Sequence, residues 1–388
     1  MKLAFVVPRY GAEVLGGAEY AARRLAEGVA ARPGWSVDVL TSCAKDAGTW
    51  ADEYPPGETI EGGVRVVRYA SRAGRAPDFP SVQGRVLANP RAATDGEAFE
   101  FIAAQGPDNP DLAAAAAASD ADLVAFSPYL YHPTVYGLPP VGDRAVLHAA
   151  AHDEGPFWLP IFPPVFEAAA AFVFHTDEER RLVERAFDVA STPSLVLGLG
   201  VDDPPPTSAP PPVDGPYLLF LGRQSTGKAL EPLISFFAEH KRASPGPLRL
   251  VLAGQPVDPL PDHPEIVKTG PVDDDTRWAL MRGAEAFVHP SAHESFGLVL
   301  LESWLAGTPV LVNRSSGAMR ELVERSGGGL LFDGYASFST SVDRLVADAD
   351  LRTGLAAAGR DFTLETFRWP ALVDRYVAFL QSVAARRS

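Results

Sequence analysis

The sequence is poor in cysteine and has no long apolar run. Its single cysteine, Cys43, cannot form an intramolecular disulfide or a thiolate metal site, so no oxidising compartment is required. No stretch of 18 apolar residues occurs, and the apolar run before Pro8, Leu3–Val7, has only five residues, so neither a membrane span nor a signal-peptide core is expected. These absences predict a cytoplasmic protein, and the abundance of Ala, Gly, Pro and Arg suggests a bacterial source.

Basic residues are also scarce. The chain has 34 Lys and Arg against 49 Asp and Glu, a net charge of −15 that disfavours a nucleic-acid partner. The imbalance is uneven, because residues 1–213 carry −12 and residues 214–388 only −3. The second half is therefore the expected host of an anionic ligand, and at most peripheral membrane contact is expected of the acidic first half.

What the chain does have is an alternation of short apolar runs and helical segments. Leu3–Val7, a glycine-containing loop, the helical pattern of Tyr20–Ala31 and the run Val37–Thr41 form a βαβ opening, typical of a parallel doubly wound sheet. Residues 71–110 show no clear period. Later elements of the first half are expected at Val64–Tyr69, Leu123–Ser127, Ala145–His148, Ala170–His175 and, as a charged helix, Asp177–Ala186.

Seven prolines among residues 202–216 predict a stiff connector between two halves. A second alternating series follows, with expected elements Tyr217–Leu221, Leu230–Arg242, Leu248–Ala253, Ile266–Thr269, Asp274–Ala284, Ala286–His289, Phe296–Ala306 and Pro309–Asn313. The fold class is thus α/β, with two Rossmann-like doubly wound domains facing one cleft. Ligands of such folds bind at the carboxyl ends of the strands, so the loops after the strands are the candidate sites.

The segment from His289 to Gly297, leading into a helix, is the most informative of these loops. The first N–H groups of that helix, near Phe296, Gly297 and Leu298, suit a phosphate or sugar hydroxyls, with Ser295 beside them. Glu294 in the loop and Glu302 in the helix are expected to accept hydrogen bonds from two parts of one ligand. Three other glutamate pairs share this eight-residue spacing, so the strand, turn and helix around this pair carry the assignment.

A second constellation, Gly222 to Lys228, follows the first strand of the second half. Arg223 offers a bidentate fork and Lys228 a point charge, which together suit a diphosphate. Taken by itself, this motif is equally well explained by solvated cations in a surface turn. In the first half, Gly16 and Gly17 fit a loop that approaches a ligand closely, and an ordinary turn explains them as well.

His152 begins a His-Asp-Glu loop that suits chemistry, although structural histidines are commoner than catalytic ones. His148, His175 and His289 lie on apolar runs and are expected to be interior. His132, together with the aromatic residues Phe157 and Trp158, could line an acceptor pocket or serve equally well in loop packing. Two Asp-X-Asp triplets, at 120–122 and 348–350, are interpreted as solvated flanks, so no metal site is predicted.

Together these motifs resemble the retaining, GT-B-fold glycosyltransferases of family 4, which use nucleotide-diphosphate sugars. The resemblance covers most of the chain. It implies that Arg223 and Lys228 grip the donor diphosphate, that Glu294 and the amides after it hold the donor sugar, and that Glu302 holds the ribose. It also matches Gly16 and Gly17 to the family's Gly-Gly after the first strand, and His152 to a histidine that lies near the sugar in that family. Ala229 departs from the pattern, because a glycine usually follows the lysine in this family.

The resemblance implies a metal-independent retaining transfer from a UDP- or GDP-linked donor to an acceptor hydroxyl, with no further cofactor. Expected domains are an acceptor-binding domain over 1–203, a linker over 204–216, a donor-binding domain over 217–366 and a crossover helix over 367–388. The base is expected near Pro271 and Val272. A carbohydrate, glycolipid or small molecule is the expected acceptor, and the oligomeric state is left open. Alternatives are a GT-B sugar-nucleotide epimerase or hydrolase, and a catalytically silent sugar-nucleotide-binding protein.

Overall fold

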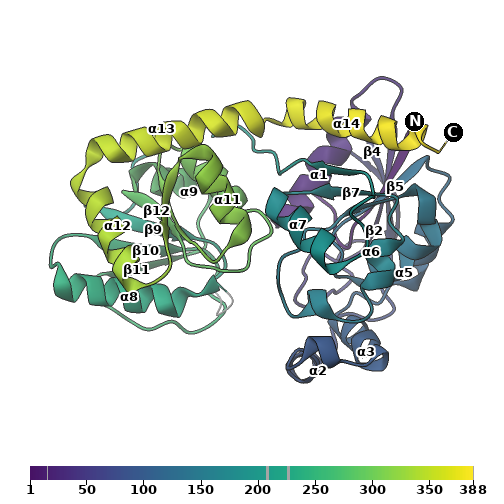
Figure 1. The fold of residues 1–388 in the computed structure, drawn as a ribbon, viewed down its shortest axis with the longest axis horizontal. Coiled ribbons are helices and arrows are strands. Elements are labelled where there is room, and N and C mark those ends of the chain that lie inside the picture. Colours follow the sequence, from purple (N-terminus) through teal and green to yellow (C-terminus); the bar gives the residue numbers. More distant parts are fainter. Residues whose placement is uncertain (15, 207–208, 225–227, 388) are drawn as a thin grey trace. The chain divides into compact units, whose positions relative to one another are not determined.

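A computed structural model describes residues 1–388 except 15, 207–208, 225–227 and 388. The chain divides into two compact units (Figure 1): unit 1 comprises Met1–Leu199 with Trp369–Ser388, and unit 2 comprises Gly200–Arg368. The division falls after Leu199, four residues before the predicted end of the first domain, and the proline-rich residues 204–216 belong to unit 2.

Unit 1 contains an eight-stranded sheet in the order β3-β4-β2-β1-β5-β6-β7-β8. All neighbouring strands are parallel except the pair β3–β4, which is antiparallel. The strands are β1 Lys2–Val6, β2 Ser36–Ser42, β3 Gly57–Glu61, β4 Val64–Tyr69, β5 Leu123–Phe126, β6 Ala145–His148, β7 Ala171–Phe174 and β8 Ser194–Val196. The helices are α1 Gly17–Ala30, α2 Phe79–Val86, α3 Asp95–Gln105, α4 Pro110–Ala117, α5 His132–Val141, α6 Pro163–Glu167, α7 Asp177–Ala186 and α14 Trp369–Ala385, with short 3₁₀ turns at Pro90–Ala92, Gly142–Arg144 and Pro156–Trp158.

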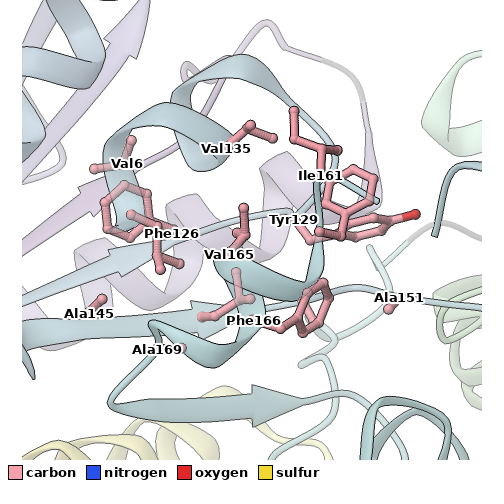
Figure 2. Packing of buried hydrophobic residues seen from close by; sticks show 14 of the residues in the cluster. Val6, Phe126, Tyr129, Val135, Ala145, Ala151, Ile161, Val165, Phe166 and Ala169 are labelled. Atoms are coloured by element: carbon pink, nitrogen blue, oxygen red, sulfur yellow. The ribbon is translucent and has the colours of Figure 1, made fainter. Parts of the chain in front are cut away.

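An aromatic cluster fills the core of unit 1 behind β5 and β6. Figure 2 shows Phe126, Tyr129, Val165 and Phe166 packed in this cluster. The rings of Phe166 and Phe187 stack with centroids 4.2 Å apart, and Tyr129 meets Phe162 edge-on at 4.8 Å. Because buried aromatics contribute large apolar areas, this cluster fixes the loops that leave the carboxyl ends of β5 and β6.

Unit 2 contains a six-stranded, fully parallel sheet in the order β11-β10-β9-β12-β13-β14. The strands are β9 Tyr217–Leu221, β10 Arg249–Ala253, β11 Ile266–Gly270, β12 Ala286–His289, β13 Val310–Asn313 and β14 Gly329–Phe332. The helices are α8 Leu230–Ala243, α9 Asp274–Gly283, α10 Leu298–Leu305, α11 Gly317–Ser326, α12 Tyr335–Ala347 and α13 Ala349–Thr366. Alternate strand residues such as Leu218 and Phe220 pack with the apolar faces of α8 and α12 in one core cluster.

The strand order of unit 2 reverses between β9 and β12. β10 and β11 follow one another on one side of β9, and the chain then returns to place β12 on the other side of β9. In doubly wound sheets the crevice at this reversal is the usual ligand site, because the loops after the two adjacent strands diverge there. The loops after β9 and β12 are the two segments that the sequence singled out. The predicted α/β fold with two doubly wound parallel sheets is confirmed.

Residues 71–110 differ from the sequence-based expectation, whereas the C-terminal helix agrees with it. Residues 71–110, which lack an apolar period, contain α2 and α3, and α3 begins with a capping box in which Thr94 and Glu97 satisfy each other's backbone N–H groups. That Thr-X-X-Glu signal was present in the sequence. The C-terminal helix begins at Trp369 and packs on unit 1, where Arg32 pairs with Asp374 at 2.6 Å.

Candidate functional site

The candidate site of unit 2 is formed by the loops that follow β9 and β12. The loop after β12 places Glu294, whose side chain is 17% exposed, so that its Oε1 accepts a hydrogen bond from Lys228 Nζ of the loop after β9. Because β9 and β12 are adjacent and parallel, their carboxyl ends bring these two oppositely charged side chains together. The sequence predicted both residues, and the structure joins them directly.

His289, the last residue of β12, lies behind this ion pair. Its Nε2 is 3.7 Å from Oε1 of Glu294, and its Nδ1 is buried without a hydrogen-bond partner among the described residues. Burial lowers the pKa of His289 to about 4, so the ring is neutral at physiological pH. Burial alone would raise the pKa of Glu294, but it is outweighed and the pKa is lowered, by protonated His289 in the acidic range and by the charge and hydrogen bond of Lys228. Glu294 is therefore an ionised acceptor.

The start of α10 is shaped by glycine. Gly297 is the N-cap residue with φ 98° and ψ 52°, and a Cβ there would lie 2.8 Å from Cγ of Met319. Phe296 is buried and meets Phe367 edge-on at 5.4 Å, which anchors the turn, whereas Ser295 and Leu298 are half-buried. The first N–H groups of a helix have no intrahelical acceptor, so this end of α10 offers donors beside Glu294.

Glu302, the fifth residue of α10, is paired within unit 2. Its Oε2 lies 2.7 Å from Nη1 of Arg277 on α9, and the two side chains are 17% and 23% exposed. Burial alone would lower the pKa of Arg277, but the Glu302 carboxylate raises it. Glu302 thus lies in the region predicted, and it has a cationic partner that the sequence reasoning missed.

The loop after β9 exposes the cation of Arg223, and the buried side chain of Gln224 joins this loop to the end of β10. Gly222 has φ 152°, and Arg223 is exposed, with no hydrogen bond or ion pair to any residue that the structure describes. Gln224 is 2% exposed, and its Nε2 donates to the carbonyl oxygens of Leu252 and Gly254 at 3.2 Å each. Gln224 was missed as a functional residue, since nothing in the sequence marks a buried glutamine. Residues 225–227 of the predicted constellation lie outside the described residues.

Ala229 connects this loop to α8 in a conformation that suits glycine. Its φ of 53° and ψ of 37° lie in the left-handed region, which L-residues with a Cβ occupy at a cost. The chain therefore uses an alanine in a backbone geometry that favours the glycine of the resembled family.

The loop after β11 holds the residues predicted for the base. Gly270 has φ 71° and accepts a hydrogen bond from Gly254 N at 2.9 Å, which joins the loops after β10 and β11. Pro271 is exposed and Val272 half-buried, and α9 starts directly afterwards with Asp273 as its N-cap. An exposed ring and an open backbone are compatible with a flat ligand, but the structure gives these two residues no specific role.

In unit 1, Gly16 and Gly17 lie where the loop after β1 enters α1. Gly16, the N-cap residue, has φ 150°, and a Cβ there would lie 2.1 Å from Oε2 of Glu19, whereas a Cβ on Gly17 would meet nothing within 4 Å. Glu19 in turn accepts a hydrogen bond from Arg9 Nη2. The Gly16 backbone and the Glu19 side chain therefore pack against each other. Arg9 was missed by the sequence reasoning.

His152 lies on the loop after β6, in a network of carboxylates and aromatics. Its Nε2 is 3.3 Å from Oε2 of Glu154, whose Oε1 accepts a hydrogen bond from the hydroxyl of Tyr129 at 2.9 Å. Asp153 accepts a bond from Trp158 Nε1 at 2.7 Å. The ring of Trp158 is thus held by the loop, and the guanidinium of Arg91 lies over it, 3.4 Å from the ring centroid.

Glu179 on α7 ties this loop to the next one and was missed by the sequence reasoning. It is 3% exposed and accepts hydrogen bonds from Ala151 N at 2.9 Å and from His175 N at 2.6 Å. Ala150, just before this contact, has φ 53°. The Thr176-X-X-Glu179 spacing suggests a capping box, but the carboxylate binds the amide of His175 and that of the distant Ala151 instead.

The remaining histidines and acidic triplets are structural in character. His148, His175 and His289 are 5%, 8% and 4% exposed, which confirms that they are interior. His132 is 7% exposed with Nε2 3.2 Å from Asp108, which favours loop packing over an acceptor surface. Asp120 pairs with Lys2, and Asp348 caps α13. Among the described residues, no group of three or more His, Cys, Asp or Glu side chains is placed to hold a metal ion.

Comparisons with known proteins bear on these sites. Residues 206–362 match the model of the family described as glycosyl transferases group 1. The chain is 37% identical over 110 residues, 28% of its length and 32% of the relative's, to the lipopolysaccharide core biosynthesis glycosyltransferase LpsE of Rhizobium meliloti. It is 30% identical over 195 residues, 45% of its length and 43% of the relative's, to the D-inositol 3-phosphate glycosyltransferase of Acidothermus cellulolyticus. The matches thus span less than half of either relative.

Almost the whole chain shares its fold with a solved structure. Sucrose-phosphate synthase from Thermosynechococcus elongatus superposes with a TM-score of 0.70 at 18% identity, covering 99% of each chain. This likeness shows the GT-B fold. Within the described part of the chain, no helix has the length and apolar character needed to cross a bilayer.

Proposed function

We propose that the chain is a glycosyltransferase that moves a sugar from a nucleotide-diphosphate donor to an acceptor hydroxyl. The observation that carries this proposal is the Lys228–Glu294 pair at the strand reversal of unit 2, beside the exposed Arg223 and the N-terminus of α10. Cations for a diphosphate, carboxylates for hydroxyls and the first turn of a helix come from loops and a helix of the region that matches the family of glycosyl transferases.

The charges of the site suit the chemistry of glycosyl transfer. When the bond between the anomeric carbon and the β-phosphate oxygen breaks, negative charge grows on the phosphate and positive charge on the sugar ring. Lys228 and Arg223 would stabilise the departing diphosphate, and fixed cations of this kind act more strongly on the transition state than on the ground state. Glu294 would accept hydrogen bonds from the sugar hydroxyls. Because these two side chains would neutralise the departing diphosphate, no metal cation is needed for that purpose, and the proposed reaction is metal-independent.

The stereochemical course and the acceptor follow from the same proposal. Transfer would proceed with retention, by attack on the same face of the sugar as the departing phosphate, with the donor bound by unit 2 and the acceptor by unit 1. The loop after β6 would supply His152 to position the donor sugar, and Trp158 would offer an aromatic surface to a carbohydrate, glycolipid or small-molecule acceptor. UDP- and GDP-linked sugars are the first donors to test.

The test is a thermal-shift screen of the full chain against UDP-, GDP-, TDP- and ADP-sugars, followed by product analysis with the stabilising donor and a panel of acceptors. A glycosylated product with the donor's anomeric configuration supports the proposal. Release of nucleotide with a free sugar derivative as the main product, without any acceptor, would instead identify an epimerase or hydrolase. Stabilisation by a donor without turnover on any acceptor would identify a sugar-nucleotide-binding protein.

The proposed metal independence is tested with the same assay. Addition of EDTA to the active mixture is expected to leave turnover largely intact. Loss of activity that Mn²⁺ restores would contradict this part of the proposal and turn attention to the Asp-X-Asp triplets at 120–122 and 348–350.

A further inference from the structure

Arg277 holds the carboxylate that is proposed to bind the ribose. Nη1 of Arg277 lies 2.7 Å from Oε2 of Glu302, within charge-assisted hydrogen-bond distance, and the arginine side chain is only 23% exposed. The two residues lie on different helices, α9 and α10, so the contact is tertiary and not a by-product of helical spacing. The position of the Glu302 carboxylate is therefore set by a residue outside its own helix.

The pair leaves most of the hydrogen-bonding capacity of the carboxylate for a ligand. An ionised carboxylate offers about four lone-pair directions on its two oxygens, and Arg277 occupies one of them. Oε1 has no partner among the described residues. A vicinal diol such as that of ribose presents two hydroxyl donors, which suit the remaining acceptors of one ionised, immobilised carboxylate.

The placement of Arg277 also links Glu302 to the loop predicted for the base. Arg277 lies in the first turns of α9, and its backbone N–H donates to Asp273 O at 2.8 Å, directly after the loop with Pro271 and Val272. Its Nε contacts Asp274 at 3.2 Å, but that aspartate is 84% exposed, so the contact is solvated and weak. The partly buried contact with Glu302 is the stronger of the two.

We propose that Arg277 is a positioning residue that orients Glu302 toward the ribose diol and thereby makes the donor site selective for ribonucleotides. This inference rests on the proposed function, because it assumes that unit 2 binds a nucleoside diphosphate. Without Arg277, the Glu302 side chain regains rotamer freedom and loses the cation that fixes it. Ordering the Glu302 side chain again when the ligand binds then reduces the affinity, and the reduction applies only to ligands whose ribose diol contacts Glu302.

The experiment measures dissociation constants by isothermal titration calorimetry for UDP, GDP and ADP and for their 2′,3′-dideoxy analogues. Wild type is expected to bind at least one of the ribonucleotides at least about tenfold more tightly than its analogue, a difference of about 1.4 kcal/mol. Arg277→Leu is expected to lose most of this ratio, by weakening the ribonucleotide and leaving the dideoxy analogue unchanged. Arg277→Lys, which keeps the charge without the planar fork, is expected to restore part of it.

A double-mutant cycle separates positioning from general damage. If Arg277 acts through Glu302, Arg277→Leu adds little to the loss of ratio already caused by Glu302→Gln. Asp274→Asn, which removes the exposed partner of Arg277, is the matched control and is expected to keep the wild-type ratio. Arg277→Gln serves as a second variant if the leucine variant does not fold, as judged by circular dichroism.

The outcomes distinguish this inference from the proposed function. Absence of binding by all three ribonucleotides to wild type would overturn both. Binding without discrimination against the dideoxy analogues, or discrimination that survives in Arg277→Leu and Arg277→Gln, would overturn the role of Arg277 while leaving the proposed glycosyltransferase intact. A selective loss of the ratio that depends on Glu302 would establish the role.

Discussion

Lys228 donates a hydrogen bond from Nζ to Oε1 of Glu294, and this contact joins the loops after the adjacent strands β9 and β12. The ion pair partly neutralises the lysine, whereas Arg223 is exposed and has no partner in the described part of the chain. Under the proposed function, Arg223 would therefore meet the diphosphate first, and Lys228 would share its three donors between Glu294 and the phosphate.

Removal of either cation is expected to reduce turnover strongly. Lys228→Ala or Arg223→Ala should lower kcat by one or more orders of magnitude, comparable to the loss of about 10²–10³ on removing an oxyanion-hole donor. Steady-state kinetics with the stabilising donor measure the effect. Arg325→Ala is the control, because Arg325 is 44% exposed and its ion pair with Glu321 and its cation–π contact with Phe362 lie outside the loops after β9 and β12. Near-wild-type turnover in both Lys228→Ala and Arg223→Ala would contradict the proposal that these residues bind the donor diphosphate.

Ala229→Gly is expected to stabilise the protein. The left-handed conformation at φ 53° costs an L-residue about 1–2 kcal/mol, of which the greater entropy of glycine in the unfolded chain offsets a part. We expect a net gain of about 0.5–1 kcal/mol in the free energy of unfolding, measured by urea denaturation. Ala306→Gly is the contrast, because Ala306 has φ −74° and gains nothing from glycine. Equal effects of the two substitutions would contradict the strain argument.

Gly297→Ala is expected to impair donor binding as well as stability. A Cβ at this position meets Cγ of Met319 at 2.8 Å, and the backbone has φ 98°, so the turn before α10 has to shift. Gly307, at the other end of the same helix, has φ 85° but open space around a Cβ. Gly307→Ala therefore controls for backbone strain, and it should lower the thermal midpoint while leaving KM for the donor unchanged. A donor KM that stays at the wild-type value in Gly297→Ala would show that this turn does not contact the donor.

The buried Glu179 is expected to make folding less favourable as the pH rises. Burial raises its pKa to about 8 from an ordinary value of 4.5, so between these values the folded state retains a proton that the unfolded state releases. Its contribution to stability is complete below pH 4.5 and is lost as the pH rises toward 8. His148 and His289, with pKa values lowered by burial to about 3 and about 4, act in the opposite direction, but only below pH 6.5.

The window from pH 6.5 to 8 isolates this effect. Urea denaturation of wild type is expected to show a free energy of unfolding that falls across the window, and Glu179→Gln is expected to remove that slope. Glu178→Gln, the neighbouring residue at the surface of α7, should keep it. A wild-type slope that persists in Glu179→Gln would assign the titration to another group.

The parts of the site that follow from sequence are those with local signals. Strand β12, the turn after it and the start of α10 are contiguous in sequence, so the positions of Glu294 and Gly297 in that turn could be predicted from the pattern alone. Arg277 and Glu302 are 25 positions apart on two helices, and only tertiary packing brings them together. Gln224 and Glu179 are polar residues that are buried because their hydrogen bonds go to backbone groups of other loops, which no periodicity reveals. Residues 71–110 showed no apolar period because the apolar residues of α3 lie around much of the helix circumference. The capping box of Thr94 and Glu97 was the local signal for this helix.

The two places where the chain passes between the units lie next to each other. Val201 N donates to Phe367 O at 3.0 Å, Val201 and Arg368 form a parallel bridge, and Arg368 pairs with Asp203. Unit 2 is therefore an insertion with neighbouring ends in a chain whose first and last segments both belong to unit 1. A gene fragment encoding 200–368 would yield unit 2 as one continuous polypeptide, whereas unit 1 alone would require a short artificial connection from Leu199 to Trp369.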